Sequence, residues 1–198
     1  MPSIYIPGYL EVIFGPMKSG KSERLINFFN TLKYSEIKGI VFKPAVNTRE
    51  ENIATRAYDI DLEAIAIDEK NPNTILHYLE DEDFKFIGID EAHMFDINLV
   101  EVIDSLLLKD YHIIVCGLIL SFRGEPFGPM PWLIGRAHKI TRLTAICEYP
   151  GCNRQATRSQ RLINGDPAPY NSPLLLIENS SSNEKYEARC CFHHIVPK

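Results

Sequence analysis

The sequence predicts an α/β fold: a mostly parallel β-sheet flanked by helices, followed by a smaller, cysteine-bearing C-terminal domain. Three observations support this expectation. Up to about Leu143, short β-branched runs alternate with helical patterns, the order typical of a parallel sheet covered on both faces. A glycine-bearing loop joins the first strand to the first helix. From about Thr144 the alternation stops, and cysteines and prolines become frequent.

The composition limits the classes of partner. The 198 residues suffice for one sizeable domain with a small appendage, which we divide as 1–143 and 144–198. The net charge of -5 lacks the basic excess of duplex-binding proteins, so no nucleic-acid partner is expected. No apolar run approaches the roughly 18 residues of a membrane span, and the N-terminus lacks signal-peptide features. We expect a cytoplasmic protein without membrane contact, whose five cysteines are free, metal-bound or catalytic.

The first half alternates strand and helix. Tyr9–Phe14, "YLEVIF", is predicted as a buried strand that ends at the glycine loop. Residues 22–39 then place four apolar side chains on one side of a helix: Leu25, Ile26, Phe29 and Leu32. The later elements are strands at 39–45, 84–90 and 111–120 and a helix at 97–109. The segment 144–198 is too small for a generous core and would benefit from a metal ion.

The glycine loop matches G-x-x-x-x-G-K-[ST], the phosphate loop of P-loop NTPases, through the residues Gly15, Pro16, Met17, Lys18, Ser19, Gly20, Lys21 and Ser22. Its backbone N–H groups and the following helix N-terminus would bind anionic oxygens. Lys21 would reach the terminal phosphates, and Ser22 would offer its hydroxyl to magnesium. Lys18 is either a second phosphate contact or a solvated lysine. The alternative for the whole motif is a glycine turn without a ligand.

Two carboxylates follow the strand predicted at 84–90. Asp90 and Glu91 emerge at its C-terminal end, the edge where α/β sheets hold ligands. Asp90 is suited to hold magnesium, directly or through water, and Glu91 could accept a proton from an attacking hydroxyl. The alternative is that the pair only caps a helix. Beside a phosphate loop, the pair favours phosphoryl transfer.

Four residues of the C-terminal segment have the spacing of a structural zinc site, as C-x4-C and C-x2-H: Cys147, Cys152, Cys190 and His193. Cys191 and His194 compete as ligands, and the spacing alone leaves that alternative open, as well as one in which no cysteine binds metal. Four protein ligands leave no open position, which disfavours a catalytic zinc. Cys116 lies in an apolar strand and is expected in the core.

These three features, in this order, resemble the type II thymidine kinases, the zinc-bearing cytosolic family. The likeness runs from about Leu10 to the C-terminus, in the strings "GPMKSGKS", "FKPAVNTR", "IDEAHMF", "SFRGEPFGPM", "KITRLTAIC", "ATRSQRLINGDPAPY" and "YEARC". The resemblance implies a P-loop kinase domain, a zinc-binding lasso domain, and use of ATP with Mg²⁺. It also implies a homotetramer inhibited by a deoxynucleoside triphosphate.

The resemblance implies roles for individual residues. Glu91 matches the catalytic base that takes the proton of the sugar 5′-hydroxyl. The segment that faces the bound nucleotides is matched by Asp90, Glu91, Ala92 and His93. Arg49 matches an arginine near the phosphates, and its alternative is a solvated loop residue.

On the nucleoside side, Phe122 matches the aromatic residue packed on thymine, Met17 the residue near the base methyl group, and Tyr186 a tyrosine that contacts the nucleoside. The start of the lasso loop, whose backbone grips the base edge, is matched by Leu174, Leu175, Leu176, Ile177 and Glu178. Without the family, Phe122 and Tyr186 would be interpreted as core aromatics.

The chain departs from the family pattern at several places. Lys18 replaces a phenylalanine or similar residue, Asn47 replaces the aspartate of D-T-R, and Ile119 replaces the aspartate of G-L-D-x-x-F. His93 and Met94 stand where glutamine and phenylalanine are usual. The lasso string "ENSSSNEKY" and the first zinc-ligand spacer are longer than usual. The parts for phosphoryl transfer are retained, so the departures concern base recognition and rate.

Two functions are therefore considered. The first is a thymidine kinase that transfers the γ-phosphate of ATP to the 5′-hydroxyl of thymidine, with deoxyuridine as a further candidate substrate. The second is a catalytically impaired homologue that binds nucleotide as a binding or regulatory protein, suggested by Asn47, Ile119 and the longer lasso. A nucleic-acid-binding zinc-finger module is disfavoured by the acidic charge and by a phosphate loop that it would not need.

Overall fold

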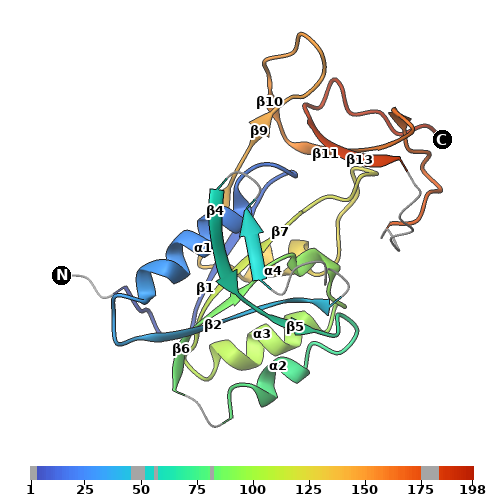
Figure 1. Cartoon of the computed structure of the whole chain (residues 1–198). Helices are drawn as coiled ribbons and strands as arrows, with labels where there is room; N and C mark the ends of the chain where they lie inside the picture. Colours follow the sequence, from blue (N-terminus) through green and yellow to red (C-terminus); the bar gives the residue numbers. More distant parts are fainter. Residues whose placement is uncertain (1–3, 46–51, 56–57, 81–82, 175–182) are drawn as a thin grey trace.

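Six parallel strands form the central sheet, in the order β5-β2-β6-β7-β1-β8 (Figure 1). The structure is a computed structural model that describes residues 4–45, 52–55, 58–80, 83–174 and 183–198. The strands are β1 (Tyr9–Phe14), β2 (Lys38–Pro44), β5 (Ile65–Ile67), β6 (Phe84–Ile89), β7 (His112–Gly117) and β8 (Lys139–Arg142). All six residues of β7 are buried, as expected for a central strand covered on both faces.

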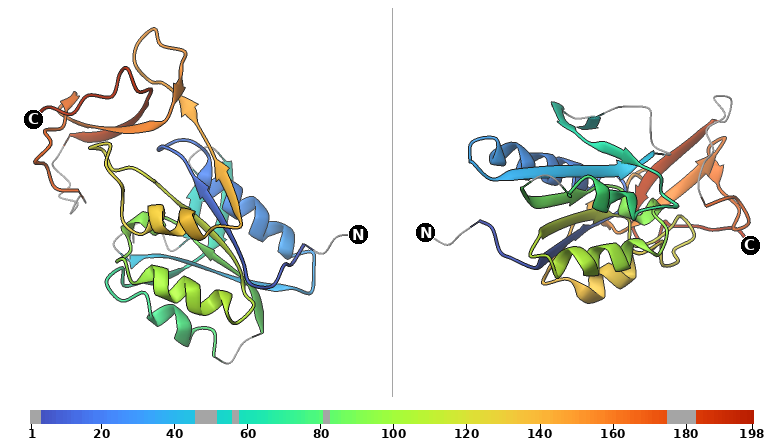
Figure 2. Two further views of the ribbon diagram at one scale, coloured as in Figure 1. Left: turned by 180° about the vertical axis from the view of Figure 1, so that it is seen from behind. Right: turned by 90° about the horizontal axis from the view of Figure 1, so that it is seen from below.

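Helices cover both faces of this sheet, as the view from below shows (Figure 2). One face carries α1 (Lys21–Leu32), against which the hairpin of β3 (Asn52–Thr55) and β4 (Tyr58–Glu63) lies. The other face carries α2 (Thr74–His77), α3 (Leu99–Leu107) and α4 (Met130–Arg136). A single turn of 3-10 helix, η2 (Ala92–Met94), follows β6. The predicted α/β class with a mostly parallel sheet is confirmed.

Close packing of α1 on the sheet depends on two glycines. A Cβ atom at Gly39 or at Gly88 would lie 2.8 Å from the ring of Phe29. The ring thus rests directly on the backbones of β2 and β6. The four apolar side chains predicted on one side of this helix are all buried: Leu25, Ile26, Phe29 and Leu32.

The helices are shorter than their periodicity predicted. α1 ends at Leu32 rather than near residue 39, because Tyr34 and Ser35 turn back onto its last carbonyls. Likewise α3 spans Leu99–Leu107 within the predicted 97–109. The β3–β4 hairpin and strand β8 were not predicted, since short strands carry little periodicity.

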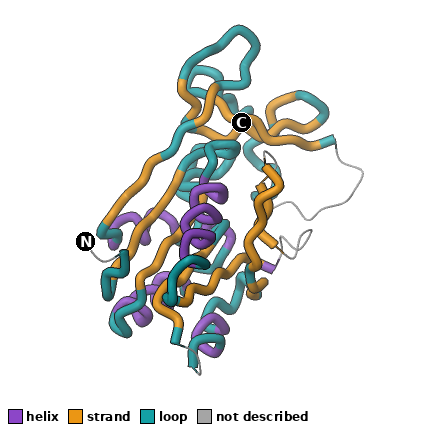
Figure 3. The backbone as a smooth tube through the Cα atoms, turned by 60° about the vertical axis from the view of Figure 1, so that its left-hand side comes forward, coloured by secondary structure: helices purple, strands orange, loops and turns teal. Residues whose placement is uncertain are grey.

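The C-terminal segment forms two small antiparallel sheets at one end of the molecule, at the top of Figure 3. Their strands are β9 (Ala145–Ile146), β10 (Gln155–Ala156), β11 (Arg158–Ile163), β12 (Asp166–Pro167) and β13 (Glu184–Arg189). Their shared core is a small cluster, namely Cys147, Ala156, Ala188 and Cys190. Among the residues that the structure describes, every helix is too short or too polar to span a bilayer.

Candidate active site and metal centre

The phosphate loop connects β1 to α1 and turns tightly at the end of β1. Gly20 adopts a φ of 79° and Lys18 one of 61°, both in the left-handed region. A Cβ atom at Gly15 would lie only 2.6 Å from the carbonyl oxygen of Leu143 and from Oγ of Ser19. Glycine is therefore required at position 15 by close backbone packing and favoured at position 20 by its dihedral angle.

The lysine of the motif points into this loop. Lys21 is 7% exposed, and its Nζ donates a 2.8 Å hydrogen bond to the carbonyl oxygen of Pro16. Oγ of Ser19 donates to the same carbonyl, also at 2.8 Å. A buried ammonium group next to a loop of backbone N–H groups is the local arrangement that binds phosphate oxygens.

Asp90 follows β6 and is buried beside the phosphate loop. Burial, followed by the negative charge of Glu91, raises the pKa of Asp90 to about 7, while a hydrogen bond from Ser22 opposes the rise. In the described part of the chain its Oδ1 has no hydrogen-bond partner. A buried carboxylate with an unsatisfied oxygen beside a serine hydroxyl fits a divalent cation such as Mg²⁺.

Glu91 occupies a left-handed conformation with φ of 48°, unusual for a residue with a side chain. It stands at the N-cap of η2, but no side-chain hydrogen bond caps that turn, which argues against a purely capping role. Its carboxylate remains about one third exposed. Burial raises the pKa of Glu91, and the Lys21 ammonium opposes the rise.

The ring of His93 lies next to the carboxylate of Glu91. The backbone N–H of Leu118 donates to Nδ1 of His93 at 3.2 Å, and burial lowers the pKa of His93 to about 3. The ring is therefore neutral, with its proton on Nε2. Nδ1 also lies 3.3 Å from Oε2 of Glu91.

Among the residues expected around the nucleoside, Met17 and Phe122 contact the C-terminal segment, and Tyr186 lies within it. Phe122 is buried, and Tyr186 on β13 is half-buried, with burial raising its pKa. The backbone N–H of Met17 donates a 3.0 Å hydrogen bond to Oγ of Ser159 on β11, so the phosphate loop touches this segment directly. Leu174 is exposed. Five of the predicted site residues lie outside the described residues: Arg49, Leu175, Leu176, Ile177 and Glu178.

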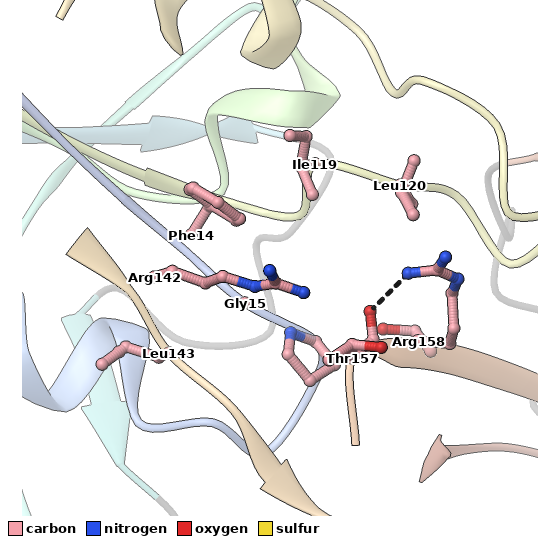
Figure 4. A pocket seen from close by; sticks show the side chains of 10 residues that line it. Phe14, Gly15, Ile119, Leu120, Arg142, Leu143, Thr157 and Arg158 are labelled. Carbon is pink, nitrogen blue, oxygen red and sulfur yellow. Dashed lines mark hydrogen bonds between the residues drawn. The ribbon is translucent and has the colours of Figure 1, made fainter. Parts of the chain in front are cut away.

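A cavity of about 30 Å³ opens beside the phosphate loop (Figure 4). Arg142 and Arg158 reach toward it from β8 and β11, and Ile119 lines it from the loop after β7. Arg158 donates to the carbonyl oxygen of Thr157 at 3.3 Å. A space of this size holds one water molecule rather than a nucleoside.

The cysteine–histidine spacing brings together four ligand atoms, all within 4.8 Å of one another, from Cys147, Cys152, Cys190 and His193. The Sγ atoms of Cys152 and Cys190 are 4.0 Å apart, and Nδ1 of His193 lies 3.4 Å from Cys190 Sγ. Ligands about 2.3 Å from a tetrahedral zinc ion are about 3.8 Å apart. The cluster could therefore hold a structural metal such as zinc.

The two competing ligands point elsewhere. Cys191 is exposed, and Nε2 of His194 lies 2.8 Å from the carbonyl oxygen of Phe122, to which it can donate. Cys116 is buried in β7, as expected for a core residue, and burial raises its pKa.

Sequence reasoning missed the contacts of three residues that connect these parts. Glu148, next to Cys147, accepts hydrogen bonds from Lys18 Nζ and from the backbone of Ala188, both at 2.5 Å. His194 holds the backbone of Phe122, and Arg161 lies against the ring of Phe122. The unusual charge at Lys18 was the one signal in the sequence, since a lysine in an uncharged position suggests an acidic partner.

Comparison with known proteins agrees with this geometry. The family model for thymidine kinase matches residues 8–194. A thymidine kinase of Coprothermobacter proteolyticus is 43% identical over 191 residues, covering 96% of this chain and 92% of the relative. A thymidine kinase of Mycoplasmoides gallisepticum is 40% identical over 190 residues, covering 96% and 82%. One of Thermococcus kodakarensis is 38% identical over 200 residues, covering 100% and 99%. The chain therefore belongs to the thymidine kinase family and is an enzyme of the kinase class.

Proposed function

We propose that this chain transfers the γ-phosphate of ATP to the 5′-hydroxyl of thymidine, with deoxyuridine as a further acceptor. One observation carries the proposal: the buried Asp90 and the partly exposed Glu91 emerge from β6 beside the phosphate loop and its buried Lys21. Phosphoryl transfer needs a phosphate cradle, a metal site and a group that orients the nucleophile. These residues can supply all three.

The phosphates would be held by the loop amides and by Lys21. Ser22 and Asp90 would hold Mg²⁺, a role supported by the unpartnered Oδ1 of Asp90. The ion, when bound, neutralises charge that builds up on the transferring phosphoryl group. Ala92 and His93 would face the bound nucleotides. Arg49 would contact the phosphates.

Glu91 would act as the general base. It would accept the proton of the 5′-hydroxyl as that oxygen bonds to the γ-phosphorus and the bond to the ADP oxygen breaks. Its raised pKa suits this task, because a base with a pKa closer to neutral binds the transferred proton more firmly.

The base of the nucleoside would pack on Phe122, with Met17 near its methyl group and Tyr186 beside the sugar or base. The backbone of residues 174–178 would grip the base edge. This placement is supported by the hydrogen bond between Met17 and Ser159, which joins the phosphate loop to the segment that carries Tyr186.

Four further properties belong to the proposal. The metal of the cysteine–histidine cluster is zinc, with a structural role. The chain divides into domains 1–143 and 144–198, which is supported by the end of β8 at Arg142 and the start of β9 at Ala145. On the family resemblance, the enzyme is a cytoplasmic homotetramer. On the same grounds, a deoxynucleoside triphosphate inhibits it.

A steady-state assay of ADP release with ATP and Mg²⁺, run with thymidine, with deoxyuridine and without nucleoside, tests the proposal. Thymidine-dependent ADP release supports it. Binding of ATP or thymidine without ADP release would favour the impaired, regulatory homologue, which is suggested by Ile119 lining the cavity beside the phosphate loop.

A further inference from the structure

Arg161 on β11 is an arginine buried to 2% exposure, among the largest side chains fully enclosed in the described part of the molecule. A buried guanidinium is costly unless its hydrogen bonds and charge are satisfied. The side-chain contacts of Arg161 therefore identify the groups that compensate for its burial. These groups lie on the side of the molecule where we propose that the nucleoside binds.

The guanidinium of Arg161 joins two separate segments of the chain. Nε and Nη2 of Arg161 donate to Oε2 of Glu184 at 2.9 and 2.7 Å, and Nη1 donates to the carbonyl oxygen of Pro173. Glu184 begins β13, whereas Pro173 precedes Leu174 on a separate stretch of chain. The planar fork of an arginine can satisfy both acceptors at once, which a lysine ammonium cannot do in the same geometry.

The same guanidinium lies against an aromatic ring. Its central carbon is 5.4 Å from the ring centroid of Phe122, within the range of a cation–π contact. Across the β11–β13 ladder, Arg161 is the direct partner of Tyr186, and directly opposed residues project to the same face of a sheet. His194 holds the carbonyl oxygen of Phe122 at 2.8 Å, which secures the backbone while Arg161 contacts the ring.

We propose that Arg161 is a positioning residue for the nucleoside: it sets the ring of Phe122, and with it the base site, while Glu184 and Pro173 hold its own guanidinium in place. The inference rests on the proposed function, because it assigns the base to Phe122. Arg161 acts through Phe122 and touches neither the phosphates nor the reacting atoms.

The first test is Arg161→Lys, which keeps the charge and removes the planar fork. The KM for thymidine is expected to rise about tenfold, while the KM for ATP and kcat at saturating thymidine change by less than about threefold. The matched control is Arg136→Lys, which alters a surface arginine paired with Asp104 on another part of the chain and should change neither KM. A purely structural role would instead lower kcat and raise both KM values together.

A double-mutant cycle tests whether Arg161 acts on thymidine binding through Phe122. In a Phe122→Leu background, Arg161→Lys should raise the thymidine KM by less than about twofold, because the ring that it positions is gone. Additive effects of the two changes would overturn the proposal. Glu184→Gln leaves the arginine in place but removes its ionic partner, and it should raise the thymidine KM by about threefold. If Arg161→Lys fails to fold, this variant decides, and an unchanged thymidine KM would overturn the inference.

Calorimetric titration with thymidine separates this inference from the proposed function. Thymidine that binds the wild type without turnover would refute the kinase proposal. A tenfold weaker binding to Arg161→Lys in that titration would still support positioning by Arg161. Equal binding by both proteins, or no binding to the wild type, would overturn the inference.

Discussion

The ammonium of Lys18 in the phosphate loop lies 2.5 Å from Oε1 of Glu148, the residue that follows the candidate metal ligand Cys147. Both side chains are partly exposed, so the pair contributes about 1 kcal/mol or less to folding stability. Its significance is geometric. Lys18 points toward the segment that carries Cys147, while Lys21 points into the loop, so the two lysines of one motif have different surroundings.

The first prediction follows from that difference. Lys21→Ala should lower kcat/KM for ATP by about 10²–10³-fold, because it removes the charge inside the cradle. Lys18→Ala should change the same quantity by less than about threefold. Steady-state kinetics at varied ATP measure both. A loss in Lys18→Ala as large as that in Lys21→Ala would make Lys18 a second phosphate contact.

The second prediction concerns the proposed base. Glu91→Gln should lower kcat by about 10²–10⁴-fold, because the amide cannot accept the hydroxyl proton. Thymidine affinity, measured by calorimetry, should stay within about threefold of the wild type. Glu101→Gln, on the exposed side of α3, serves as the control and should leave kcat unchanged. Wild-type turnover in Glu91→Gln would remove Glu91 from the mechanism.

The third prediction concerns the metal centre. Cys190→Ser should reduce the bound zinc measured by elemental mass spectrometry and lower the melting temperature, because a structural site contributes directly to folding. The adjacent Cys191→Ser changes an exposed thiol outside the cluster and should retain the metal. If Cys191→Ser lost the zinc and Cys190→Ser kept it, the ligand set would have to be reassigned.

The fourth prediction is a pH dependence of stability that arises at the N-terminal end of β7, opposite the end where Asp90 and Glu91 lie. His112 is buried among the rings of Tyr9, Phe28 and Phe86, and its Nδ1 accepts a hydrogen bond from the backbone of Ile6. Burial lowers the pKa of His112 to about 4, from 6.5 in the unfolded chain. Because the unfolded chain binds the proton more readily, the stabilisation is fully present above pH 6.5. It is lost as pH falls through 4.

This loss should amount to about 3 kcal/mol at most. His112→Gln keeps an acceptor for Ile6 but does not titrate, so its unfolding free energy should vary less between pH 6.5 and 4. Urea unfolding at a series of pH values measures the difference. The exposed His77→Gln is the control and should keep the wild-type dependence. Parallel curves for His112→Gln and wild type would show that His112 does not contribute.

Much of the fold was readable from local patterns. The strand Tyr9–Phe14 and the start of β6 at Phe84 were predicted within a residue, because buried parallel strands are short continuous apolar runs. Periodicity overestimated α1, since a helical pattern continues in the sequence past the point where the backbone turns. The β3–β4 hairpin escaped prediction because its strands are short and its packing against α1 is a tertiary contact.

The sequence by itself determined the motifs whose parts are close together along the chain: the loop from Gly15 to Ser22, the pair Asp90 and Glu91, and the spacing within each pair of candidate metal ligands. The reason is that local spacing and backbone chemistry constrain such groups before any packing occurs. Only the tertiary structure decided which distant residues meet. It paired Lys18 with Glu148, placed Arg161 on Phe122, and directed His194 to a carbonyl oxygen rather than to the metal cluster. These contacts depend on how the small C-terminal sheets dock on the carboxyl end of the central sheet, and no local pattern encodes that docking.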